Sequence, residues 1–150
     1  MLYHYEECGL DNIIIDTDFL EEDDAGNSVI TIPAINQLHK VIAKSIIDSP
    51  GLMNGKEIRF LRTEMGMTQS ELGKLLHRDK QTVARWEKSR MNIDPAQDML
   101  VRKHVAEKLG LEMDKSIEEL SQERTATIRN NQIKIKHSNC SEGHKYTVAA

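Results

Sequence analysis

Two short helices specified between residues 68 and 88 constrain the fold of this chain more than any other feature. Thr68 followed by Glu71 has the pattern of a capping box, in which each side chain binds the other residue's backbone N–H. Asp79 is of a type preferred at helix N-termini, so it predicts the start of a second helix. Only the tripeptide HRD separates the two predicted helices, and that spacing is typical of a helix-turn-helix motif.

The two faces of the second helix differ in character. Val83 and Trp86 are three residues apart, so they lie on one face and are expected to point into a core. The opposite face carries polar, basic and small side chains, namely Lys80, Gln81, Ala84, Arg85 and Lys88. Gly73 lies inside the first helix, where glycine costs about 1 kcal/mol relative to alanine. We interpret it as a point of close approach, at which a side chain would collide with the second helix.

The charge distribution indicates where a polyanion could bind. The chain of 150 residues has a net charge of −4, which by itself argues against nucleic acid. Residues 1–54, however, hold two Lys and ten Asp or Glu, a net of −8, whereas residues 55–90 hold nine Lys or Arg and five Asp or Glu, a net of +4. Residues 91–150 hold nine of each sign. The basic segment therefore contains the two helices, and it is the predicted surface for phosphates.

The exposed face of the second helix matches what a DNA major groove requires. A Gln side chain can bond an adenine edge through two atoms, and Arg or Lys can bond guanine O6 and N7. A small alanine lets the helix approach closely, and its methyl group can meet a thymine methyl. The residues predicted to read bases are Lys80, Gln81, Ala84 and Arg85.

Phosphate contacts are predicted on both helices and just after them. Helix N-termini favour phosphate through backbone N–H groups and the helix dipole, so Thr68 and Gln69 are expected to meet the DNA backbone. Lys88 and Arg90 are basic residues at the end of the second helix, and they are expected to contact phosphates as well.

The stretch MTQSELGKLLHRDKQTVARWEKSR, residues 67–90, resembles the Xre/lambda-repressor-like helix-turn-helix family. The matching elements are TQSELGKLL, QTVARWE and the basic Arg90. The resemblance implies base contacts by Lys80, Gln81 and Arg85, and a phosphate contact by Thr82. The family usually has glycine where this chain has His77, because the turn needs a positive φ. Histidine tolerates that conformation better than most residues, so the fold is expected to survive with local strain.

A second resemblance concerns the antitoxins and their relatives. GKEIRFLRTEMGMTQSEL, from residue 55, is similar to the form of this domain in the MqsA and HigA groups, as is the preceding segment with a CGL sequence. MqsA-type proteins bind zinc in their N-terminal module through paired CxxC motifs. This chain has a single Cys8 there and no CxxC, so a zinc site of that type is not expected.

The remaining chain predicts further elements. NIIID and SVITI are β-branched runs around a polar loop, and they predict two antiparallel strands. A helix follows from about Pro33, with Ile35, Leu38, Ile42 and Ile46 at helical spacing, and DSPG ends it. Its apolar stripe is expected to pack on the strands, although part of it could form a dimer seam instead.

Capping signals place three more helices. Asn54 with Glu57 starts a helix that ends at Gly66, and its polar face carries Arg59 and Arg62, either solvated or in contact with phosphate. Asp94-Pro95 starts a helix that stops at Gly110, and Ser116 with Glu119 starts a short one. In the first helix of the motif, the predicted buried side chains are Leu72, Leu75 and Leu76.

Together these patterns predict an α+β protein with a mainly helical, lambda-repressor-like DNA-binding domain. The expected division is an N-terminal α+β module with two strands at residues 1–50, for dimerisation or partner binding, a helix-turn-helix domain at residues 52–112, and an extension at residues 113–150. QIKIKHS and KYTVAA in that extension are compatible with a C-terminal hairpin, although NCSEGH between them is long for a tight turn.

Other classes of protein are less well supported. No run of about 18 apolar residues indicates a membrane span, and the N-terminus has no signal-peptide pattern, so a cytoplasmic protein is expected. The spacing His137-x2-Cys140-x3-His144 could hold a metal, together with His4 and Cys8, but a polar surface loop is the favoured interpretation. No cofactor is expected, and no arrangement for catalysis is evident, so an enzyme is not predicted.

The predicted function is that of a sequence-specific DNA-binding transcriptional regulator, acting as a repressor. One helix-turn-helix reads about half a site, so the protein is expected to bind double-stranded DNA at an inverted repeat as a homodimer. The alternative is an antitoxin that binds a toxin protein and also represses its own operon.

Overall fold

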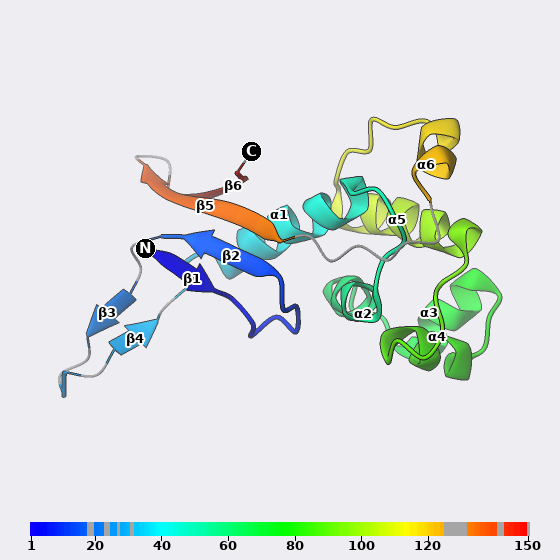
Figure 1. Ribbon diagram of the computed structural model, residues 1–150, viewed down its shortest axis with the longest axis horizontal. Helices are drawn as coiled ribbons and strands as arrows, with labels where there is room; N and C mark the ends of the chain where they lie inside the picture. The colour runs from blue at the N-terminus through cyan, green and yellow to red at the C-terminus, as the bar shows by residue number, and fades with distance from the viewer. Residues whose placement is uncertain are drawn as a thin grey trace.

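A computed structural model describes residues 1–17, 20–22, 25–26, 28–30, 32–124, 132–140 and 143–149. The fold is α+β, as predicted (Figure 1). The strands are β1 (Leu2–His4), β2 (Ile13–Asp16), β3 (Leu20–Glu22), β4 (Ser28–Ile30), β5 (Ile133–Cys140) and β6 (Gly143–Val148). The helices are α1 (Ile35–Asp48), α2 (Gly55–Glu64), α3 (Gln69–Leu76), α4 (Lys80–Glu87), α5 (Pro95–Leu109) and α6 (Ile117–Glu123).

The principal sheet joins the two ends of the chain. Its strand order is β1-β2-β5-β6, with β1 antiparallel to β2, β5 parallel to β2, and β6 antiparallel to β5. The predicted C-terminal hairpin is therefore confirmed, but it pairs with the N-terminal strands and does not form an extension separate from residues 1–50. The physical reason is that an isolated hairpin is only marginally stable, whereas Ile133 and Ile135 become buried when β5 lies beside β2.

The predicted pairing of NIIID with SVITI is wrong. The strand β2 from the first run lies between β1 and β5, whereas β4 from the second run pairs with β3 in a separate two-stranded sheet. Ile13 and Ile15 of β2 are fully buried, which a central strand allows and a two-stranded ribbon does not. The local pattern could not reveal this arrangement, because β5, one of the two strands that pair with β2, lies more than 100 residues further along the chain.

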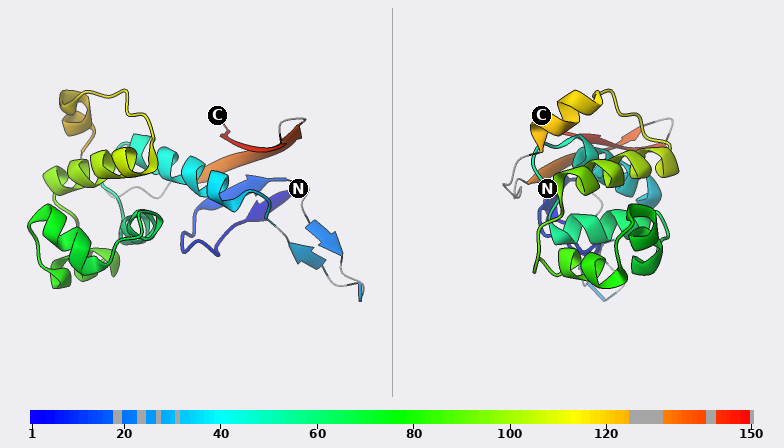
Figure 2. Two further views of the ribbon diagram at one scale, coloured as in Figure 1. Left: turned by 180° about the vertical axis from the view of Figure 1, so that it is seen from behind. Right: turned by 90° about the vertical axis from the view of Figure 1, so that its right-hand side faces the viewer.

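Helix α1 connects the sheet to the helical half of the molecule. Seen from behind, it runs from the sheet into the helices (Figure 2). It packs against β6 and against α5, and Leu38, Ile42 and Ile46 are buried as predicted. Ile35, at its first turn, is 43% exposed instead. A single hydrophobic cluster extends from the sheet through α1 into the helical half, so the two parts share one core.

The helical half follows the predicted capping signals closely. Asn54 and Glu57 form the predicted capping box of α2, and Gly110 ends α5 in a left-handed conformation. Asp94 precedes α5 but makes no side-chain cap, because its carboxylate binds Arg78. Leu75 is 42% exposed, so the prediction that it is buried is wrong, although Leu72 and Leu76 are buried. None of the helices within the described ranges is long and apolar enough to cross a membrane.

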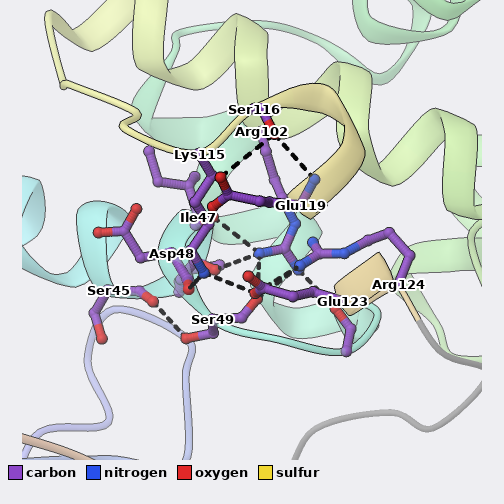
Figure 3. Close-up of polar contacts among 12 residues, drawn as sticks. Ser45, Ile47, Asp48, Ser49, Arg102, Lys115, Ser116, Glu119, Glu123 and Arg124 are labelled. Atoms are coloured by element: carbon purple, nitrogen blue, oxygen red, sulfur yellow. Dashed lines mark hydrogen bonds and ion pairs between the residues drawn. The ribbon is translucent and has the colours of Figure 1, made fainter. Parts of the chain in front are cut away.

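A buried cluster of charges fastens α1 to α5 where the sheet and the helical half meet (Figure 3). The guanidinium of Arg102 on α5 donates to four backbone carbonyls at and just beyond the end of α1, those of Ile46, Ile47, Ser49 and Gly51. Burial lowers the pKa of Arg102, and the neighbouring carboxylate of Asp98 opposes that shift. Arginine can satisfy helix C-terminal carbonyls in this way, because they have no partner within the helix.

The same cluster also holds the end of α6. Asp98 accepts hydrogen bonds from Arg102 Nε at 2.6 Å, Arg124 Nη1 at 2.8 Å and the backbone N–H of Met53 at 2.8 Å. Arg124 also donates to the Ser49 carbonyl, and it lies just after α6. Residues from three distant parts of the chain thus meet here, and no sequence pattern indicated the contact.

Candidate nucleic-acid interface

The starts of α3 and α4 are set by side-chain caps. Thr68 Oγ1 accepts from the Glu71 backbone N–H at 3.1 Å, and Glu71 Oε1 accepts from the Thr68 N–H at 3.3 Å, which confirms the predicted capping box. At the second helix, Asp79 Oδ1 accepts from both the N–H and the hydroxyl of Thr82, each at 2.7 Å. These two bonds from Thr82 lower the pKa of Asp79, so the carboxylate is held in its charged, capping form.

The turn between the helices is as tight as the sequence implies. His77 ends α3 with φ 56° and ψ 40°, which confirms the expected left-handed conformation at this position. The Arg78 N–H then bonds the Gly73 carbonyl at 2.8 Å. A Cβ atom built on Gly73 would lie 2.7 Å from the Arg78 carbonyl oxygen. The close approach predicted for Gly73 is therefore confirmed, and its closest contact is with the backbone of the turn that leads into α4.

Gly73→Ala is expected to destabilise the protein by about 1–3 kcal/mol, because the added methyl group forces the turn backbone to move. Alanine has the better helix propensity by about 1 kcal/mol, so a gain in stability would contradict the close approach. Urea denaturation followed by circular dichroism measures the change. Ser70→Ala, at an exposed position of the same helix, serves as the control and should stay within about 0.5 kcal/mol of the parent protein.

The orientation of α4 separates its core side from its surface side. Val83 is fully buried and Trp86 is 1% exposed, as predicted. The indole Nε1 of Trp86 is buried and has no acceptor among the described residues. Of the residues predicted to read bases, Lys80, Gln81 and Arg85 are exposed, and Ala84 is partly exposed. Of those predicted to contact phosphates, Thr68, Lys88 and Arg90 are exposed, and Gln69 and Thr82 are partly exposed.

A buried carboxylate that the sequence did not single out locks α4 to the preceding helices. Glu87, with a side chain 4% exposed, accepts from Arg62 Nε at 2.8 Å and from Arg62 Nη2 at 3.0 Å. Gln69 Nε2 donates to the same carboxylate at 3.3 Å. Arg62 was expected to be either solvated or in contact with phosphate. Its guanidinium instead forms an ion pair with Glu87 inside the protein. In the sequence, the only sign of this ion pair was the acidic residue Glu87 at the end of QTVARWE.

The contact between α2 and α4 is also close at the backbone. A Cβ atom on Gly55, the first residue of α2, would lie 2.4 Å from the carbonyl oxygen of Trp86 and 2.5 Å from that of Glu87. Only glycine fits at this position without a shift of one helix. The sequence pattern did not distinguish Gly55 from an ordinary residue in a helical first turn.

A hollow of about 570 Å³ lies between the two halves of the molecule, and a second one of about 530 Å³ lies at the start of α3. The second is lined by residues of α2, α3, α4 and the turn between α2 and α3, namely Arg62, Gly66, Met67, Thr68, Gln69, Ser70 and Lys80. The first backbone N–H groups of a helix have no partner within the helix, so they are available to an anion. Lys80, from the neighbouring helix, is a basic residue that lines the same hollow.

The histidines of the C-terminal hairpin, His137 and His144, lie together, and the described side chains form no metal site between them and the N-terminus. His137 Nε2 and His144 Nδ1 lie 3.0 Å apart, and Thr17 Oγ1 bonds the other ring nitrogen of His137. The side chain of Cys140 falls outside the described residues. Cys8 lies near the helical half, and burial raises the pKa of its thiol. Within the described part of the chain, no group of three His, Cys, Asp or Glu side chains could hold a metal.

Comparison with known proteins identifies the segment that carries this surface. Residues 58–100 match the helix-turn-helix family model HTH_3, so the match begins in α2 and ends in α5. No curated protein and no solved structure matches the chain. The matched segment contains both capped helices, the turn at His77 and the exposed face of α4. Residues 58–100 thus match a helix-turn-helix domain of the Xre/lambda-repressor-like type, which supports a role in DNA binding.

Proposed function

We propose that this protein is a sequence-specific transcriptional regulator that places α4 in the major groove of DNA. The observation that carries the proposal is the two-sided character of α4. Val83 and Trp86 anchor one side in the core, while Lys80, Gln81 and Arg85 extend from the other into solvent. A helix of this kind, rigidly held and exposed along one face, fits the width of a major groove.

Roles for the exposed side chains follow from their chemistry. Arg85 and Lys80 would donate to guanine O6 and N7, Gln81 would bond an adenine edge, and Ala84 would allow the close approach. The ion pair of Glu87 with Arg62 supports these roles, because it fixes the end of α4 against α2. Arg85 is exposed and its side chain makes no hydrogen bond or ion pair with another described residue, so its guanidinium is available to a base.

Phosphate groups of the DNA backbone would occupy the hollow at the start of α3. Thr68 and Gln69 line it, and Gln69 has a second amide N–H beyond the one donated to Glu87. Thr82, Lys88 and Arg90 would meet phosphates beside α4. The hydroxyl of Thr82 already donates to Asp79, so it would contact a phosphate only by redirecting that hydrogen. Such contacts position the helix without reading sequence.

A regulator of this kind would act as a two-fold dimer on an inverted repeat, since a single α4 reads about half a site. Occupation of a promoter by the dimer would repress transcription. The antitoxin alternative stays a prediction. Copurification of a small toxin protein with the full chain would support it, and a neighbouring toxin gene would do the same.

Selection of bound sequences from a random DNA pool tests the proposed function directly. We expect enrichment of one motif, arranged as an inverted repeat with half-sites about one helical turn apart. Recovery of unenriched sequences would show that the protein has no sequence preference and would contradict the proposal.

Arg85→Ala is expected to cost about 1–3 kcal/mol of discrimination between the selected motif and a motif with one altered base pair. Fluorescence anisotropy with both DNA fragments at a fixed salt concentration measures the difference. The control is Lys40→Ala, which removes the same charge from an exposed position of α1. If Arg85→Ala discriminates as well as the control variant, Arg85 does not read a base.

A further inference from the structure

The outer edge of β6 presents backbone groups that no described residue satisfies. In an antiparallel pair, the N–H and C=O of alternate residues point toward the partner strand and away from it. The Ala149 N–H bonds the Lys134 carbonyl at 2.8 Å, so residues 149, 147 and 145 face β5. His144, Tyr146 and Val148 therefore direct their N–H and C=O groups outward, along an edge with no neighbouring strand in the sheet order.

Near this edge, aliphatic side chains that could extend the hydrophobic core are exposed to solvent. Val148 has the same parity along β6 as Tyr146, whose side chain is buried and whose hydroxyl bonds the Pro33 carbonyl beside the start of α1 at 2.6 Å. Although Val148 lies on this core-facing side of the sheet, it is 51% exposed, and Ile35 in the first turn of α1 is 43% exposed. Two aliphatic side chains on core-forming faces, one on β6 and one at the start of α1, thus remain exposed to solvent.

We propose that a second copy of this chain pairs its β6 antiparallel with the first, so that the two four-stranded sheets form one continuous sheet. This inference rests on the proposed function, because it supplies the two-fold dimer that an inverted repeat requires. The added strand satisfies the outward N–H and C=O groups, and the partner's α1 and β6 cover Val148 and Ile35.

The sequence of β6 selects one register for this pairing. With the two-fold axis at Tyr146, residue 144 faces the partner's Val148 and Tyr146 faces the partner's Tyr146. Each of these pairs can exchange two backbone hydrogen bonds, about six in all. Lys145 then faces the partner's Thr147. An axis at Lys145 would place two lysines directly opposite each other, which is destabilising.

Other surfaces of the molecule fit a second copy less well. The opposite edge of the sheet is β1, which has three residues, and such a short edge gives little length for pairing. An apolar groove of about 620 Å³ lies between α5 and α6, lined by Ala96, Met99, Leu100, Met113, Ile117 and Leu120 among others. It has no strand edge whose backbone groups would fix the register of a second copy, so nothing in it selects a particular partner.

The test measures the molar mass of the full chain in solution and then alters the edge. By light scattering after size exclusion, at micromolar concentration, the parent protein is expected to have twice the 17.1 kDa mass of one chain. The double variant Val148→Lys with Ile35→Lys places like charges at the proposed contact, and it is expected to be a monomer. Both positions are exposed in the single chain, so the circular dichroism spectrum of the folded variant should match that of the parent protein.

Leu100→Lys is the matched control, since Leu100 is 54% exposed and lies in the groove between α5 and α6. It should leave the dimer intact. A monomeric parent protein, or a double variant that remains a dimer, would overturn the proposal. A dimer that Leu100→Lys dissociates and the double variant does not would locate the interface at the groove, and would also overturn it.

DNA binding separates this proposal from the proposed function. The monomeric double variant should bind an isolated half-site as well as the parent protein does. For the full inverted repeat its affinity should fall about a hundredfold, because the two domains are no longer linked. If the parent protein forms the β6 dimer but shows no preference for any DNA sequence, the interface stands and the proposed function fails.

Discussion

Arg102→Ala is expected to lower the free energy of unfolding by about 3–5 kcal/mol, because it removes one partner from a buried group of charges. Arg102 is 1% exposed and Asp98 is fully buried. The truncation leaves the carboxylate of Asp98 with fewer donors, and it removes the donor from the carbonyls at the end of α1. Urea denaturation monitored by circular dichroism at constant pH and salt measures the loss.

An exposed ion pair between the same two halves of the molecule provides the control. Lys56 of α2 binds Asp11 of the loop between β1 and β2 at 2.8 Å, but both side chains are more than half exposed. Lys56→Ala should therefore cost less than about 1 kcal/mol. If the two variants lose similar stability, the buried cluster does not hold the halves together.

Trp86→Ala is expected to cost about 3–5 kcal/mol, because it leaves a cavity where α4 packs on the core. The loss should also weaken binding to every DNA sequence, since α4 is then less firmly held against α2. Trp86 is the single tryptophan of the chain, so unfolding of this variant has to be followed by circular dichroism. A melting temperature equal to that of the parent protein would contradict the buried position.

Trp86→Phe distinguishes ring packing from the role of the indole nitrogen. Phenylalanine keeps an aromatic ring in the core and removes Nε1, which has no acceptor among the described residues. This variant should therefore recover most of the stability that Trp86→Ala loses. A loss as large as that of alanine would mean that Nε1 makes a stabilising contact in solution.

Local chemistry explains why the helix-turn-helix could be predicted in detail. The caps at Thr68 and Asp79, the glycine at position 73 and the turn at His77 each depend on residues within about six positions in the chain. Such interactions leave a pattern in consecutive residues, and the resemblance of residues 67–90 to a known family rests on the same pattern. The exposure of Lys80, Gln81 and Arg85 follows directly from helix geometry.

Contacts between distant residues account for the errors. Arg62 was considered for solvent or phosphate, but its side chain binds Glu87, which lies 25 positions further along. The nearest β-branched run was assigned as the partner of β2, whereas β2 pairs with β1 and β5. Many pairings satisfy the same alternation of apolar residues, and only the burial achieved by the whole fold selects among them.

The amino-acid sequence by itself determined the positions of the helices, the turn between α3 and α4, and the polar face of α4, because caps, glycines and apolar spacing act over a few residues. The tertiary structure decided which strands share a sheet, how Arg102, Asp98 and Arg124 join its two halves, and that the edge of β6 is left open. These features depend on burial and on pairing between parts of the chain that are far apart in sequence, so no local pattern encodes them.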